Sequence, residues 1–282
     1  MSRHPSYTKP LMGENTWKGS VAVLAYFLYS EGMKIGVYGM GRFGSFWASL
    51  LASHGHEVYG YTRHAVSVPP GVSLVGEDEI LGQENLFLCV PISAFKDVVT
   101  NISPRLTPAT TVFDTCSVKL YPYAVMEELL VSRGIPCIAT HPMFGPDSGA
   151  HGVKDLPMML SSVASSADIG PWEKEFSSWG LTVLHMNCDT HDKETAWSQG
   201  VTHFVGRTLD ELHLGHTDLA TTGYRRLMSI VEQTCNDPRQ LFYDLQRYNP
   251  YASDMRRHLR QALDKVMAEL VAQDMAVRME KT

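Results

Sequence analysis

The stretch MKIGVYGMGRFG, Met33–Gly44, constrains the fold of this chain more than any other. Lys34–Tyr38 is apolar and partly β-branched, which predicts a short buried strand. Glycines at G-x-G-x-x-G spacing follow directly, and the residues after them show the apolar periodicity of a helix. A dinucleotide-binding turn requires this order of strand, glycine turn and helix, so the sequence predicts a site for NAD(P) or FAD.

Each glycine of this turn has a separate structural role. Gly39 permits the tight turn, Gly41 lets the backbone approach a pyrophosphate, and Gly44 lets the helix lie close to the strand. The first turn of the helix offers free N–H groups and the positive end of its dipole to phosphates. The predicted cofactor-binding residues of the turn are Gly39, Met40, Gly41, Arg42, Phe43 and Gly44.

Composition narrows the class of protein. The 282 residues are enough for two domains or one large one, and 44% apolar with 19% charged residues is ordinary for a globular protein. A net charge of −6 argues against nucleic acid or an anionic membrane as the main partner. The five cysteines are scattered without a C-x-x-C pair, so we expect a reducing cytoplasm and neither disulfides nor a metal site.

The residues before the first strand are not expected in a dinucleotide-binding domain, which normally begins at that strand. The apolar run Val21–Tyr29 is too short to span a bilayer, and it lacks the small-residue cleavage site of a signal peptide. We expect 1–32 to form an N-terminal extension, either packed on the next domain or largely disordered.

Apolar runs alternate with helical patterns from Met33 to about residue 187. After the first strand, strands are predicted at Glu57–Tyr61, Asn85–Val90, Thr110–Asp114, Pro136–Thr140, Pro157–Ser161 and Leu181–His185. This alternation predicts an α/β fold with a doubly wound, mostly parallel Rossmann-type sheet, and an all-helical C-terminal domain follows it. The predicted domains are the extension (1–32), the dinucleotide-binding domain (33–187) and a helical domain for substrate binding and dimerisation (188–282).

The second strand ends in Thr62, Arg63 and His64, where NAD enzymes commonly carry an acidic residue for the ribose hydroxyls. A carboxylate would repel a 2′-phosphate, whereas a hydroxyl and a guanidinium bind one through charge-assisted hydrogen bonds. The sequence therefore predicts NADP rather than NAD. The alternative is that Arg63 is a solvated surface cation.

Two loops at carboxyl ends of strands carry reactive side chains, namely Ser117 with Lys119, and His141. A neutral imidazole, with an ordinary pKa of about 6.5, can take a proton from a substrate hydroxyl as hydride leaves the carbon. We therefore predict that His141 is the catalytic base and that Ser117 orients its ring. The competing interpretation is a structural histidine bonded to the backbone.

A helix is predicted from Asp192 to about Leu212, with Thr190 or Asp189 as its N-cap. Gln199 and His203 lie four residues apart in it, so they share one face. That face is a candidate wall of a binding site.

Taken together, these motifs resemble a known family, the prephenate/arogenate dehydrogenases of tyrosine biosynthesis. The resemblance extends from Met33 to about residue 265 and rests on GVYGMGRFG, DTCSVK, THPMFGPDSG, CDTHDKETAWSQGVTHFVGRTL, LATTGYRRL and YNPYA. The specific part is SVK, then HPMFGP, then SQ-x-x-TH on a helix. The plant-like, NADP-using branch is the most similar one.

The resemblance implies roles for individual residues. His141 would bind or deprotonate the ring hydroxyl with support from Ser117, and the substrate pocket would be lined by Gln199 and His203. The residues expected beside the nicotinamide are Cys89, Val90, Pro91 and Thr115. The arginine that some members use for the ring carboxylate is absent here, so its role is expected to fall to Lys119, Arg207, Arg225 or Arg226.

The implied reaction is an oxidative decarboxylation without a metal, in which the ring carbon bearing the hydroxyl gives up hydride, carbon dioxide leaves and the ring becomes aromatic. Asp237 matches an acidic residue that accompanies arogenate use, because its carboxylate would pair with the ammonium that prephenate lacks. The other interpretation is that Asp237, before Pro238, caps a helix. NADP-dependent conversion of arogenate to tyrosine is expected, and formation of 4-hydroxyphenylpyruvate from prephenate is the alternative.

Two rival functions use the same fold. A β-hydroxyacid or 6-phosphogluconate dehydrogenase would place a lysine on the first long helix of the second domain, where this chain offers Gln199 and His203. A nucleotide-sensing regulatory protein would not need Ser117, His141 and His203 together.

The last helical segment bears an apolar stripe, made up of Met255, Leu259, Leu263, Val266 and Leu270. Together with the resemblance, this stripe predicts a homodimer built through the helical domain. The alternative is that the stripe completes the core of a monomer.

Overall fold

The computed structural model describes residues 32–279, and the chain from Lys34 onward forms one compact unit. The extension predicted over 1–32 lies outside the described residues, apart from Gly32. The domain boundary predicted between 187 and 188 stays a prediction, because the residues on both sides of it belong to the same unit.

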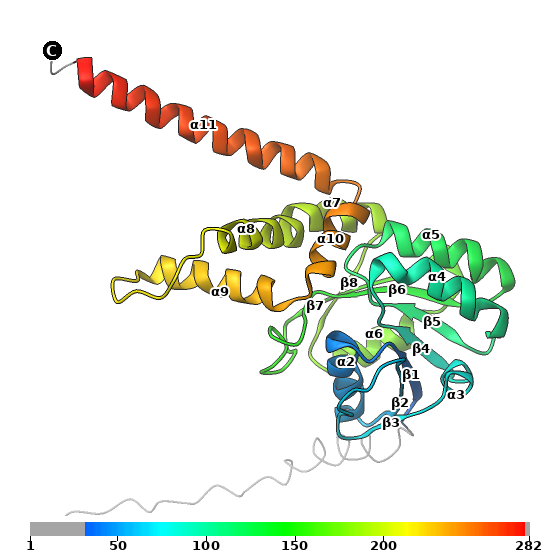
Figure 1. Cartoon of the computed structure of the whole chain (residues 1–282). Coiled ribbons are helices and arrows are strands. Elements are labelled where there is room, and N and C mark those ends of the chain that lie inside the picture. The colour runs from blue at the N-terminus through cyan, green and yellow to red at the C-terminus, as the bar shows by residue number, and fades with distance from the viewer. Residues whose placement is uncertain (1–31, 280–282) are drawn as a thin grey trace, which may run out of the picture. The chain divides into compact units, whose positions relative to one another are not determined.

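An eight-stranded sheet forms the first part of this unit, with the strand order β3-β2-β1-β4-β5-β6-β7-β8 (Figure 1). All neighbouring strands are parallel except β6 and β7, which are antiparallel. The strands are β1 (Lys34–Tyr38), β2 (Glu57–Tyr61), β3 (Val72–Leu74), β4 (Asn85–Leu88), β5 (Thr111–Asp114), β6 (Cys137–Pro142), β7 (Pro157–Ser162) and β8 (Thr182–His185). The predicted doubly wound, mostly parallel sheet is confirmed, and β3 is a strand that the sequence pattern did not predict.

Helices cover both faces of the sheet, with α4 and α5 on one face and α2 and α6 on the other (Figure 1). The helices of this part are α2 (Arg42–Ser53), α3 (Glu77–Leu81), α4 (Ile92–Ile102), α5 (Leu120–Leu129) and α6 (Gly170–Ser178), with short 3-10 turns at Ser103–Arg105, Val131–Arg133 and Val163–Ser165. Strand β4 is buried on both faces, which explains the apolar run Leu86–Leu88. Leu86 and Leu88 belong to the core on one face, while Phe87 packs on Trp47 of α2 and Trp172 of α6.

After β8 the described chain continues only in helices, as predicted. These are α7 (Cys188–Thr195), a π-helical turn η4 (Ala196–Gly200), α8 (Val201–Asp210), α9 (Thr222–Asn236), α10 (Arg239–Tyr248) and α11 (Ala252–Met279). Two sequence predictions are wrong in detail. The N-cap of α7 is Asn187, whose side chain accepts from Thr190 N, so neither Thr190 nor Asp189 is the cap.

The second error concerns α10, whose N-cap is Pro238 without a side-chain capping hydrogen bond. The carboxylate of Asp237 therefore does not cap this helix. It is bound elsewhere, by Arg42.

In α11, Met255 is fully buried and Leu259 is half-buried, but the apolar side chains of the stripe from Leu263 onward are exposed: Leu263 by 58%, Val266 by 54% and Leu270 by 57%. The stripe therefore does not complete the core of the single chain. None of the helices in residues 32–279 combines the length and the apolar character needed to cross a membrane.

Candidate active site

A pocket of about 520 Å³ opens at the carboxyl ends of β1, β4 and β5, beside the helices that follow the sheet. Strand order reverses between β1 and β4, which is where open α/β sheets bind their ligands. The lining comes from the glycine turn, from the loops after β4, β5 and β6, from η4 and α8, and from the residues around the α9–α10 junction. The predicted site residues among them are Gly41, Arg42, Phe43, Gly44, Cys89, Val90, Pro91, Thr115, Ser117, Gln199, His203 and Asp237.

The glycine turn has the shape that a dinucleotide requires. Gly39 has a φ of +107°, and a Cβ on it would lie 2.4 Å from the carbonyl oxygen of Cys89. A Cβ on Gly44 would lie 1.8 Å from Gly39 O, so the helix can approach the strand only with glycine there. Around Gly41 the space is open to 4 Å, on the pocket side. The close backbone contacts at Gly39 and Gly44 and the open space at Gly41 together fit a bound diphosphate.

Other predicted cofactor residues hold different positions. Met40 is 1% exposed and packs beneath Gly60, so only its backbone can face a nucleotide. Thr62, Arg63 and His64 follow β2 as predicted; they are outside the pocket lining, and Arg63 and His64 are exposed. An adenosine end bound over β2 would reach them there.

The loops after β4 and β5 form the wall where the nicotinamide is expected. Thr115 Oγ1 donates to Leu88 O at 3.1 Å, which joins the two strand ends. Burial raises the pKa of the neighbouring Cys89 thiol to about 12, so Cys89 is a neutral packing residue and not a nucleophile.

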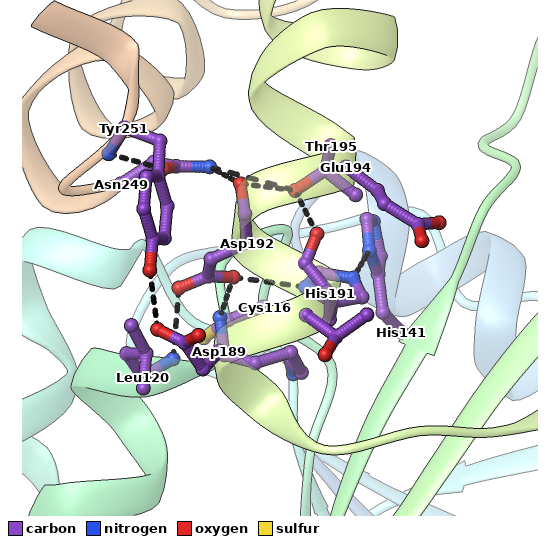
Figure 2. Close-up of polar contacts among 12 residues, drawn as sticks. Cys116, Leu120, His141, Asp189, His191, Asp192, Glu194, Thr195, Asn249 and Tyr251 are labelled. Carbon is purple, nitrogen blue, oxygen red and sulfur yellow. Dashed lines mark hydrogen bonds and ion pairs between the residues drawn. The ribbon is translucent and has the colours of Figure 1, made fainter. Parts of the chain in front are cut away.

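His141 lies at the end of β6 with 1% of its surface exposed, and it is not itself part of the lining, although the next residue, Pro142, is. Its Nδ1 is 2.8 Å from Nε2 of His191, and Nδ1 of His191 is 2.8 Å from an oxygen of Asp192 (Figure 2). Burial, helped by the neighbouring His191 and Lys119, lowers the pKa of His141 well below 6.5. The hydrogen-bond partner of the imidazole is therefore His191, whereas Ser117 lines the pocket.

Lys119 was predicted to bind substrate, and the structure contradicts this. Its side chain has no exposed surface, and its Nζ pairs with Asp114 and donates to Thr140 O at 2.5 Å. Asp114 in turn accepts from the backbone of Cys116 and of Thr140. The pair links the ends of β5 and β6, and neither residue is part of the pocket lining.

Arg225 was predicted to bind substrate too, and it also lies elsewhere. Its guanidinium donates to Ala220 O at 2.7 Å and to Thr222 Oγ1 at 3.2 Å, and the residue is absent from the pocket lining. Among the alternative cations, Arg207 donates to Asp237 O at 2.6 Å. A cation that does line the pocket is Arg42, from the glycine turn.

Gln199 and His203 both line the pocket, as predicted. They do so although Gln199 lies in the π-helical turn, a type of irregularity often found at functional sites. The buried atoms Gln199 Oε1 and His203 Nδ1 have no hydrogen-bond partner among the described residues. Polar atoms left unpaired in a pocket wall point to a polar ligand.

Arg42 links both sides of the pocket mouth. It pairs with Asp147 at 2.5 Å, in the loop after β6, and with Asp237 at 2.8 Å, between α9 and α10. Burial raises the pKa of Asp237, whereas Arg42 opposes that rise. Asp237 is thus a pocket carboxylate that already has a cationic partner.

Comparison with known proteins places this site in a family. The nucleotide-binding domain of prephenate dehydrogenase matches residues 48–156, and a TYRAAT1-like C-terminal domain matches residues 208–282. Arogenate dehydrogenase 2, chloroplastic, of Arabidopsis thaliana is 32% identical over 254 residues, covering 86% of this chain and 71% of that protein. The chain belongs to the prephenate/arogenate dehydrogenase family. It is therefore an oxidoreductase with a nicotinamide cofactor.

Further relatives are similar to this chain in sequence or in fold. Arogenate dehydrogenase 1, chloroplastic, of the same plant is 32% identical over 251 residues, which cover 84% of this chain but 39% of that protein. Two solved structures share the fold. The arogenate dehydrogenase of Synechocystis has a TM-score of 0.59 and 21% identity, covering 86% of this chain and 93% of that one. The A. aeolicus prephenate dehydrogenase in complex with hydroxyphenyl propionate and NAD+ has a TM-score of 0.64 and 18% identity, covering 86% of this chain and 91% of that one.

Proposed function

We propose that this enzyme catalyses the NADP-dependent oxidative decarboxylation of arogenate to tyrosine. The observation that carries the proposal is a single pocket that joins the glycine turn to unpaired polar atoms of Gln199 and His203 and to the carboxylate of Asp237. The plant relatives bear the name arogenate dehydrogenase, which supports the same substrate.

The residues of the pocket divide the work. When bound, NADP supplies the acceptor for the hydride. The Gly41–Gly44 turn holds the diphosphate, and Gln199 and His203 hydrogen-bond the substrate from the opposite wall. His141 accepts the hydroxyl proton, which requires that the wall next to Pro142 and Ser117 rearranges when substrate binds, because the imidazole is buried.

Substrate choice depends on Asp237. Its carboxylate is 23% exposed and lines the pocket, so it can pair with an ammonium group of the ligand. It cannot gain from the keto group of prephenate. The absence of a capping bond from this side chain to α10 leaves the carboxylate free for that role, in competition with Arg42.

Cofactor choice depends on the end of β2. Arg63 is exposed there, and no carboxylate stands among Thr62, Arg63 and His64. A guanidinium at this position favours the 2′-phosphate of NADP.

The test measures initial rates with arogenate and with prephenate, each with NADP and with NAD. We expect arogenate with NADP to give the highest kcat/KM. Asp237→Asn keeps the size of the side chain and should lower kcat/KM for arogenate at least tenfold, about 1.4 kcal/mol, while prephenate is unchanged or improves.

Two further variants complete the design. Arg63→Ala should weaken NADP but not NAD, and Asp218→Asn, which removes a carboxylate outside the pocket, should change neither substrate. A wild-type preference for prephenate would contradict arogenate as the substrate. Equal losses with both substrates in Asp237→Asn would mean that Asp237 does not set the preference.

A further inference from the structure

We infer that His191 and Asp192 are positioning residues: they fix the tautomer of His141 and share the proton that it accepts. The inference rests on the proposed function for the role of His141 as base. The tautomer itself follows from the geometry alone and can be measured without any turnover.

The three side chains form a continuous buried row at the start of α7 and the end of β6. Nδ1 of His141 lies 2.8 Å from Nε2 of His191, and Nδ1 of His191 lies 2.8 Å from Oδ1 of Asp192 (Figure 2). Their exposed fractions are 1%, 2% and 0%. Water therefore does not compete for these contacts, and each proton must be held by one of the three groups.

The carboxylate end of the row decides where the protons lie. Oδ1 of Asp192 accepts the backbone N–H of Lys119 at 2.7 Å, and Oδ2 accepts that of Leu120 at 2.9 Å. An ionised carboxylate can only accept, so the Nδ1 of His191 must carry a proton. In a neutral ring the Nε2 of His191 is then an acceptor, and the Nδ1 of His141 must donate to it. The lone pair of His141 is thereby placed on Nε2, the atom that faces away from His191.

The charged groups around the row favour neutral rings. Lys119 lies beside both imidazoles, and together with burial it lowers the pKa of His141 and of His191. Asp192 and the more distant Asp114 act in the opposite direction on His191, and Glu194 on the same helix is exposed. Both rings are therefore neutral at pH 7, as the tautomer argument requires.

The row also provides a place for the transferred proton. The O–H bond of the substrate hydroxyl breaks, and an N–H bond forms at Nε2 of His141. The Nδ1 proton of His141 can then move to Nε2 of His191, so that the positive charge comes to rest next to Asp192. The C–H bond would give its electron pair as hydride to the nicotinamide, and the electron pair of the O–H bond becomes the C=O bond. When the ring carboxylate leaves as carbon dioxide, its electron pair makes the ring aromatic, and the proton held by the row returns through His141 to the phenolate oxygen of the product.

Asp192 is held rigidly enough to set this geometry. Besides its bonds to the start of α5, its backbone carbonyl accepts from Asn249 Nδ2 at 2.7 Å (Figure 2). Substituting Asp192 would disturb that packing, so the informative variant is His191→Gln. Glutamine can still accept from His141, but it cannot take up the proton.

The first experiment measures tautomers by ¹⁵N–¹H NMR on the ¹⁵N-histidine-labelled full chain at pH 7, with His141→Asn and His191→Gln assigning the signals. Both His141 and His191 should be neutral and protonated on Nδ1. Protonation of His141 on Nε2 would overturn the inference, whatever substrate the enzyme uses.

The second experiment compares kcat–pH profiles of wild type and His191→Gln with arogenate, alongside NADP binding by fluorescence. We expect kcat to fall about tenfold, while KM and the NADP Kd stay within twofold. The acid limb should move to lower pH, because the positive charge can no longer rest on His191 next to Asp192. A move to higher pH would mean that His191 only opposes a charge on His141, and it would overturn the proton-sharing role. His56→Gln is the matched control, since the side chain of His56 is only 5% exposed and is also bonded to a carboxylate, Glu175 at 3.0 Å, but lies outside the pocket.

A lower kcat with an unmoved acid limb would mean that His191 only supports the fold, and it would overturn the proton-sharing role. If wild type turned over neither arogenate nor prephenate, the proposed function would fail, while the NMR result would still decide the tautomer.

Discussion

The imidazole of His141 is the residue on which the proposed chemistry depends. Because burial lowers its pKa, the neutral form persists below pH 6.5, and kcat should fall only as pH drops through that lowered pKa. His141→Asn should reduce kcat by about 10²–10⁴-fold, the usual cost of losing a general base. Steady-state rates from pH 4.5 to 9, with NADP binding measured by fluorescence, check both statements. Cofactor affinity should stay within twofold, since the imidazole is not in the glycine turn.

A variant that retains a tenth or more of wild-type turnover, or an acid limb above pH 7, would contradict this role. His185→Asn is a suitable control, because His185 is an exposed histidine at the end of β8.

The motif around Ser117 and Lys119 shows what a sequence pattern predicts about single residues and what it does not. The motif around Ser117 and Lys119 indicated a loop at a strand end, and the loop is there. The pattern could not show that Lys119 is turned inward, since that depends on Asp114, five residues earlier, pointing into the same space. The adjacent His191 and Asp192 at a helix start are the sequence signal for the buried row next to His141.

At the scale of elements, the glycine turn and the helical part meet through Arg42. Its guanidinium is 35% exposed and bridges Asp147 and Asp237, which are 38% and 23% exposed. Ion pairs of such exposure contribute about 0.2–1 kcal/mol to folding, so Arg42→Gln should change the free energy of unfolding by no more than that. It also removes a cation beside the diphosphate site. We therefore expect about tenfold weaker binding of NADP and of NAD alike, measured by titration calorimetry.

Arg63→Ala provides the contrast for Arg42→Gln, because it should weaken NADP alone. Unchanged affinity for both cofactors in Arg42→Gln would mean that Arg42 serves the carboxylates and not the nucleotide.

The elements of the sheet could be predicted because each strand carries its own apolar signal and each crossover its own helix pattern. Three features depend on tertiary packing and were not predicted: strand β3, the N-cap of α7 and the π-helical turn. Strand β3 has three residues and two exposed side chains, so it exists only by pairing with β2. The N-cap of α7, Asn187, lies one residue before the motif that begins at Cys188. The π-helical turn at Ala196–Gly200 has no local sequence signal.

For the whole molecule, the question is what covers α11. From Leu263 onward its apolar side chains are exposed in the single chain, including Val266 and Leu270. A soluble monomer rarely leaves such a stripe open, so we expect a homodimer through the helical part. Light scattering at micromolar concentration should give twice the mass of 31.4 kDa.

The double variant Leu263→Glu, Leu270→Glu should be monomeric, because it places charges within the stripe. Lys265→Glu, on the opposite face of the same helix, is the matched control and should remain dimeric. A monomeric wild type would contradict the prediction.

The π-helical turn at Ala196–Gly200 bears on how this pocket can change during evolution. A π-turn holds one residue more than an α-turn, so losing a single codon here would give a regular helix with both ends in place. Each residue of an α-helix advances by about 100°, at 3.6 residues per turn. Such a deletion would therefore rotate the residues before the bulge away from His203 and present a different side chain to the ligand. The presence or absence of one residue in this turn can therefore change which substrates the pocket accepts, while the sheet and its cofactor site stay unchanged.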